Sequence, residues 1–346
     1  MSNRNQVLDI AKGLLIILVV FGHSIQYGFG GAYCDTEQFY DNILFRCIYT
    51  FHMPLFMLIS GYLFYYTNKK AYREIVKSRL ITIGIPLIMY FNIIYIALYN
   101  LYHAQHFYFS HYFLALKNIM WFLSSVILNC IIVSSITHFF KDKAMRGYVI
   151  LWLLLPVIFI IPDNFIPALH KYMYPFFLIG FSQNQYSVKI PHFYWSKWTL
   201  GILTLFTIIC SFYYDKTIFI YKAGFCVYEN GVIDYEKLVI NLIRFIVGLG
   251  SSCWFVRIIF IIKHHAKIFL PFLIHLGQET LGIYGFQSVF FVVLSAITST
   301  KNINFQIDAM PFLICGLILI LCEISIRLCN SNRYTRLLFL GKLSNS

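Results

Sequence analysis

The chain of 346 residues is 59% hydrophobic and 19% aromatic, and only 12% of its residues are charged. This balance excludes an ordinary soluble domain and predicts a membrane protein. A net charge of +13 would point to nucleic acid in a soluble protein, but here the basic residues flank apolar segments, so no nucleic-acid partner is expected. The alternating segments of about ten residues that mark an outer-membrane barrel are missing, so helices are the expected spanning elements.

Apolar segments of membrane-spanning length recur along the whole chain, and we predict ten transmembrane helices. They cover residues 8–28, 42–65, 80–102, 118–140, 147–162, 172–187, 198–215, 238–262, 280–298 and 309–329. No small-residue cleavage site follows the first segment, so we expect it to be retained as a span. The sequence therefore predicts an all-α polytopic membrane protein with one transmembrane domain, residues 1–346.

Lysine and arginine are concentrated in alternate loops and at both ends of the chain. The densest run follows the second span and consists of Lys69, Lys70, Arg73, Lys77 and Arg79. Because basic residues accumulate on the cytoplasmic side, both termini are expected in the cytoplasm. The same run should lie close to anionic lipid headgroups.

The first span carries a stripe of ionisable residues. Lys12 and His23 are eleven positions apart, which on a helix is three turns plus about 20°, with a rise of about 16 Å. Asp9 falls on the same stripe, about 40° to the other side of His23. Such groups in a span need a polar pocket or an anchoring role. For Lys12 the alternative is an anchor at the headgroups, for Asp9 an ion pair with Lys12 or a helix-start role, and for His23 a structural hydrogen bond.

The second span has a basic residue and a histidine of its own. Arg46 and His52 are six positions apart, about 240° around a helix, so we expect one to face a pocket and the other a neighbouring helix. Ser60 and Gly61 fit close packing between helices. Near the last two spans, Glu279 and Glu323 are carboxylates whose basic partners the sequence does not identify.

Two exterior segments invite further interpretations. His103, His106 and His111 suggest a metal, but their spacing matches no strong ligand motif and interfacial anchoring by aromatic residues explains the segment better, so no metal is expected. The tyrosine-rich residues 216–236 are interpreted as an ordinary solvated loop, with a lid over an acceptor site as the alternative. Cys34 and Cys226 both fall in expected exterior loops, where a disulfide is an open option.

An ordered set of motifs resembles the acyltransferase-3 family of membrane-bound acyltransferases, most closely its fucose 4-O-acetylase-like branch, across almost the whole chain. The motifs are Asp9-x-x-Lys12-Gly13 ending in Gly22-His23-Ser24, then Phe51-His52-Met53-Pro54-Leu55-Phe56, Ser60-Gly61-Tyr62, Trp121-Phe122-Leu123, Tyr174-Pro175-Phe176-Phe177 with Gly180, and Gly277 with Thr280-Leu281-Gly282-Ile283-Tyr284. The resemblance implies acyl transfer, usually of acetyl from acetyl-CoA, to a sugar hydroxyl of a surface polysaccharide or its lipid-linked precursor, in the bacterial cytoplasmic membrane.

The family's hallmark is a basic residue and a histidine separated by ten residues, which here are Lys12 and His23. Lysine replaces the usual arginine and acts as a point charge rather than a bidentate fork. Many relatives also carry a histidine shortly after the Ile-Tyr of the ninth span, where this chain has Gln287. A second histidine role at that position is therefore not available.

These residues suggest a mechanism in which His23 is the general base, since an imidazole ordinarily titrates near pH 6.5. Lys12, with Asp9 beside it, is expected to meet the anionic end of acetyl-CoA. Arg46, His52 and Trp121 are candidates for holding the acceptor or the oxyanion.

The alternative from another class is a transporter or flippase of a lipid-linked sugar, because buried Arg, His and Glu are equally expected along a translocation path. No convincing pair of interrupted helices in the two halves supports it. A polymerase of sugar repeats is disfavoured because no large exterior loop is predicted.

Overall fold

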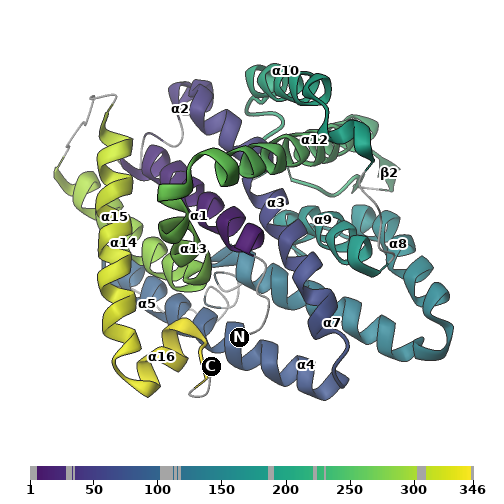
Figure 1. The fold of residues 1–346 in the computed structure, drawn as a ribbon, viewed down its shortest axis with the longest axis horizontal. Helices are drawn as coiled ribbons and strands as arrows, with labels where there is room; N and C mark the ends of the chain where they lie inside the picture. Colours follow the sequence, from purple (N-terminus) through teal and green to yellow (C-terminus); the bar gives the residue numbers. More distant parts are fainter. Residues whose placement is uncertain are drawn as a thin grey trace. The chain divides into compact units, whose positions relative to one another are not determined.

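The computed structural model describes residues 6–28, 33, 36–101, 112, 115, 118–185, 191–220, 224–229, 231–301 and 309–343. Helices dominate this part of the chain, and its one sheet is a short antiparallel hairpin of β1 (Tyr228–Glu229) and β2 (Val232–Ile233) (Figure 1). The chain forms two compact units that alternate along the sequence. The first unit comprises residues 1–49, 81–120 and 258–346, and the second comprises residues 50–80 and 121–257.

The first unit is built around α1 (Gln6–Gly28), which packs against three helices from the C-terminal part of the chain. These are α13 (Leu270–Gln278), α14 (Thr280–Lys301) and α15 (Met310–Asn330). Figure 1 shows α14 and α15 lying side by side, with α16 (Arg333–Leu340) at their end. α5 (Ile85–Leu101) contacts α14 and α16, and the unit also holds α2 (Glu37–Asp41), the first residues of α3 (Ile43–Thr67) and the short turn η5 (Lys267–Phe269).

Two glycines allow α1 and α13 to touch along their backbones. A Cβ atom on Gly13 would overlap the carbonyl oxygen of Leu273, and one on Gly277 would overlap the carbonyl oxygen of Asp9. Without a hydrophobic driving force between helices in lipid, close approach through small residues supplies the packing energy. The two glycines therefore fix the face of α1 that carries Asp9 against α13.

The second unit is centred on α7 (Trp121–Phe139), which packs against α4 (Tyr72–Arg79), α8 (Ala144–Ile160) and α9 (Ala168–Gln185). It further includes α10 (Lys197–Tyr213), most of α3 and of α12 (Tyr235–His265), and the short turns η3 (Lys141–Lys143) and η4 (His192–Trp195). A π-helical turn, η2 (Leu80–Gly84), continues α4 into α5.

A second reciprocal pair of glycines joins α3 to α9 within this unit. A Cβ atom on Gly61 would overlap the carbonyl oxygen of Phe177, and one on Gly180 would overlap that of Leu58. The prediction that Gly61 serves close helix packing is confirmed.

Eight helical segments in the described part of the chain are long and apolar enough to cross a membrane. They are Gln6–Gly28, Ile43–Thr67, Tyr72–Leu98, Trp121–Phe139, Lys141–Ile160, Tyr235–His265, Thr280–Thr298 and Met310–Asn330. The prediction of an all-α polytopic membrane protein is confirmed. At the other two expected spans the structure has α9, which is polar at both ends, and α10, an apolar helix of 17 residues. The cytoplasmic placement of both termini and the single-domain organisation stay predictions.

The segment between α10 and β1 is anchored by buried polar groups of the second unit. The guanidinium of Arg244, which is 2% exposed, donates to the carbonyl oxygens of Ile218 at 2.5 Å and Gly224 at 2.7 Å. Asn241 donates its side-chain amide to the carbonyl of Phe225 at 2.7 Å.

A second anchor comes from the loop before α9. One carboxylate oxygen of Asp163 accepts the backbone N–H groups of Phe225 and Cys226 at 2.8 and 3.3 Å. The other lies 2.5 Å from the ammonium of Lys171, which is buried. Because Phe219, Ile220 and Phe225 are also buried, the interpretation of the segment as an ordinary solvated loop is wrong for this part of it, whereas residues 231–233 are exposed. Cys34 lies outside the described residues.

Glu279 and Glu323, whose basic partners the sequence does not identify, form ion pairs within the first unit. Glu279 lies 2.5 Å from the ammonium of Lys342. Glu323 contacts Arg327 at 2.6 Å and the imidazole of His275 at 2.9 Å. In both cases a basic residue, Lys342 or Arg327, offsets the cost of placing a carboxylate near the membrane.

Candidate active site

The charged stripe predicted on the first span is present on α1, which is unbroken from Gln6 to Gly28. The ammonium of Lys12 lies 2.9 Å from the carboxylate of Asp9, one helical turn earlier. The Asp9 side chain is 4% exposed and the Lys12 side chain 17%. A carboxylate buried to this degree needs a paired cation, and Lys12 supplies it. An ammonium has three N–H donors, so Lys12 can contact a further anion while it holds Asp9.

His23 lies further along α1 and is tied to α14. Its Nδ1 atom is 2.8 Å from the side-chain oxygen Oε1 of Gln287, which is 0% exposed. The amide orientation of Gln287 is set by its own neighbours, because its Nε2 group donates to the carbonyl of Tyr284 at 3.2 Å and to the hydroxyl of Ser288 at 3.0 Å. An amide NH₂ can only donate and an amide oxygen can only accept, so Oε1 is the atom that faces the imidazole.

This arrangement selects one tautomer of the histidine. Since Oε1 of Gln287 accepts, Nδ1 of His23 must carry the hydrogen, and Nε2 is left with its lone pair. The nitrogen that can take up a proton is therefore the one directed away from Gln287. A partner that fixes the tautomer in this way is the usual device by which proteins prepare a histidine for acid–base chemistry.

Two aromatic rings flank the imidazole within the first unit. Tyr27, one turn along α1, has its ring centroid 5.9 Å from that of His23, and Phe291 of α14 lies 5.8 Å away in an edge-on orientation. Tyr27 and Phe291 also contact each other at 5.9 Å. These rings restrict the imidazole to one orientation, while the side chain stays partly exposed.

Arg46, near the start of α3, is engaged with the short helix before it. Its guanidinium lies 2.5 Å from the carboxylate of Asp41 and donates to the carbonyl of Tyr40. The Arg46 side chain is 14% exposed, whereas Asp41 is 72% exposed. This contact connects α2 to α3, and the role predicted for Arg46 at an acceptor or an oxyanion is not tested by it.

His52 and Trp121 both belong to the second unit. His52 is buried, with 4% of its surface exposed. Trp121 is part-buried at the first position of α7, directly after Met120, whose φ of 59° turns the chain into the helix. The carbonyl of Trp121 accepts from the hydroxyl of Ser124, which also lies 2.8 Å from Nε2 of the buried His170.

Gln287 is the site residue that sequence reasoning missed. The sequence draws attention to this position only because many family members have a histidine there, and the glutamine predicts that a second histidine role is absent. The structure shows that this position contacts His23 directly.

Of the other predicted residues, the structure brings Asp9 and Lys12 together. His103, His106 and His111 lie outside the described residues, so the expectation that no metal binds there stays a prediction.

The fold and the site define a polytopic α-helical membrane protein with an oriented imidazole on its first helix. The chain belongs to the acyltransferase-3 family, whose description is "Acyltransferase domain" and which matches residues 5–326. The family predicted from the ordered motifs is thereby confirmed.

Two curated relatives carry the name Nodulation protein NolL. The protein from Sinorhizobium fredii is 34% identical over 189 residues, which cover 52% of this chain and 49% of the relative. The protein from Mesorhizobium japonicum is 29% identical over 231 residues, covering 64% of this chain and 59% of the relative. The chain thus matches between about half and three fifths of the length of these relatives. No solved structure matches the chain.

Proposed function

We propose that this protein is a membrane-bound O-acetyltransferase that moves acetyl from acetyl-CoA to a sugar hydroxyl of a surface polysaccharide or its lipid-linked precursor, in the bacterial cytoplasmic membrane. Membership of the acyltransferase-3 family supports the reaction class. The observation that carries the proposal is the hydrogen bond between His23 and Gln287, because it leaves the lone pair of Nε2 ready to accept a proton.

In the proposed reaction, the acceptor hydroxyl donates a hydrogen bond to Nε2 of His23. As the hydroxyl oxygen attacks the thioester carbonyl, its proton passes to Nε2 and an imidazolium forms. Collapse of the tetrahedral intermediate breaks the carbon–sulfur bond, and the departing thiolate of CoA takes the proton back from Nε2. General acid–base assistance of this kind typically contributes about 10²- to 10⁴-fold in rate.

The donor is proposed to bind along α1. Lys12 lies about 16 Å from His23 along the helix axis, so one end of an extended acyl-CoA arm can meet Lys12 while its thioester carbonyl lies beside His23. Asp9 holds the Lys12 ammonium in place at 2.9 Å. The roles of Arg46, His52 and Trp121 at the acceptor hydroxyl or the oxyanion stay predictions.

Membranes that contain the chain, incubated with acetyl-CoA labelled in its acetyl group, test the proposal. Label should appear on extracted glycan, fall at least 100-fold in His23→Ala, and stay unchanged in His264→Ala, a histidine on the exposed end of α12. Wild-type labelling by His23→Ala would refute the base assignment. Glycan that crosses the membrane without gaining label would instead identify a transporter or flippase.

A further inference from the structure

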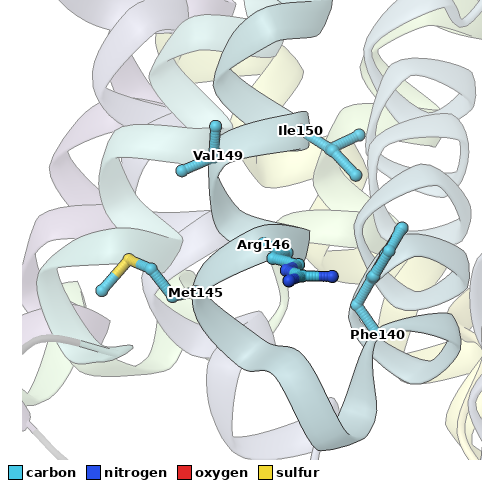
Figure 2. Close-up of a pocket in the computed structure, with 5 residues that line it drawn as sticks. All are labelled: Phe140, Met145, Arg146, Val149 and Ile150. Carbon is cyan, nitrogen blue, oxygen red and sulfur yellow. The ribbon is translucent and has the colours of Figure 1, made fainter.

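An apolar groove lies at the turn between α7 and α8, in the second unit. Its volume is about 320 Å³, and its lining residues are Phe140, Met145, Arg146, Val149 and Ile150 (Figure 2). Four of these side chains are apolar and one is a cation. A volume of this size falls at the lower end of the range of about 300–1,000 Å³ that small-molecule ligands occupy. The groove therefore suits a slender apolar ligand with a negative charge at one end.

Two basic turns meet at the end of α7 that forms this groove. The turn after α3 is joined to α7 by three hydrogen bonds: Asn68 to Thr137 at 3.0 Å, the carbonyl of Lys70 to His138 at 2.9 Å, and Tyr72 to Ser135 at 3.2 Å. The exposed cations of the two turns and of the helices α4 and α8 that follow them form what we call the basic rim, which consists of Lys69, Lys70, Arg73, Lys77, Lys141, Lys143 and Arg146. The acidic residues among them are Glu74 and Asp142, so the rim keeps a clear positive excess.

The groove lies where lipid headgroups are expected. α7 ends at Phe139 and α8 begins at Ala144, and both belong to segments of membrane-spanning length. The charged turn between them therefore falls at the membrane–water interface, with Phe139, 82% exposed, and Met145, 61% exposed, on its apolar side. An acyl chain fits the apolar walls and a phosphate fits the guanidinium, whose planar donors match phosphate oxygens.

We propose that this groove binds one anionic phospholipid, with its phosphate at Arg146 and part of an acyl chain against Phe140, Val149 and Ile150. A zwitterionic lipid carries a cation in its own headgroup, which the basic rim repels. An anionic headgroup is attracted by each nearby Lys or Arg, and one such cation changes binding about fivefold. Basic pockets beside spanning helices bind anionic headgroups for the same reason.

The test is lipid retention by the full-length chain. The protein is reconstituted in nanodiscs that contain equal amounts of phosphatidylglycerol and phosphatidylcholine, released into mild detergent, and its retained lipids are counted by native mass spectrometry. We expect phosphatidylglycerol to be retained in preference, and Arg146→Gln to lower that preference about fivefold. The matched control is Lys197→Gln, an exposed cation at the start of α10, which should leave the preference unchanged.

A second pair of variants tests the groove without altering charge. Val149→Trp fills the groove and should abolish the retained phosphatidylglycerol, whereas Val239→Trp adds the same bulk at a half-exposed position of α12 and should not. Equal loss in Arg146→Gln and Lys197→Gln would overturn the proposal in favour of general attraction to anionic membranes. Full retention by Val149→Trp would overturn it as well. Elution of each variant as a single species in size-exclusion chromatography shows that it folds.

Discussion

Replacing Gln287 by methionine removes the acceptor that fixes His23 while nearly preserving side-chain volume and helix propensity. In this variant the Nδ1–H group of His23 loses its acceptor, the side-chain oxygen of Gln287, which lies 2.8 Å away on a residue that is 0% exposed. Loss of this part-buried hydrogen bond costs about 1 to 3 kcal/mol and removes the preference for hydrogen on Nδ1. Because the same bond also stabilises the imidazolium that forms during proton transfer, we expect its loss to lower kcat/KM about 5- to 150-fold.

The assay is transfer of labelled acetyl at varied acetyl-CoA concentration. The loss should appear mainly in kcat, because Gln287 is proposed to orient the base and not to contact the donor. Gln278→Met, at an exposed position of α13, is the matched control and should keep the original rate. A Gln287→Met enzyme that works within twofold of the original, or a control that loses as much, would show that the tautomer argument is wrong.

Three further predictions concern the framework. Lys12→Ala removes the ammonium that lies 2.9 Å from the buried carboxylate of Asp9 and should lower the free energy of unfolding in detergent by about 1 to 3 kcal/mol, which the double variant with Asp9→Asn should largely restore; equal stability of all three proteins would contradict a stabilising role of this ion pair. Gly277→Ala should destabilise the protein because its Cβ overlaps the carbonyl of Asp9, whereas Gly316→Ala, with open space around it, should leave stability unchanged or raise it by up to about 1 kcal/mol in the same melting experiment. Arg244→Met removes the donors to the carbonyls before β1, so trypsin should cut after Lys216 at least tenfold faster; unchanged cleavage would mean that the segment is held by other contacts.

The class of fold follows from the pattern of apolar residues along the chain. Runs of about 20 apolar residues can bury their backbone polar groups in lipid only as helices, so the helical and polytopic character follows from composition and length. The spacing of Asp9, Lys12 and His23 placed them on one stripe because the helical repeat is a local property. The same local reasoning overcounted the segments that meet the length and hydropathy of a span, since α9 and α10 form as helices but are more polar or shorter than the other eight.

The partners of these side chains were decided by the tertiary structure. Gln287 is 264 residues from His23, and only the packing of α14 against α1 places its amide oxygen on Nδ1. Arg244 lies inside the predicted span 238–262, yet its guanidinium donates to backbone carbonyls 20 to 26 residues earlier in the chain. Hydrogen bonds between distant residues depend on how helices pack, and packing depends on shape complementarity such as the glycine contacts of Gly13 and Gly277, which no periodicity in a single segment encodes.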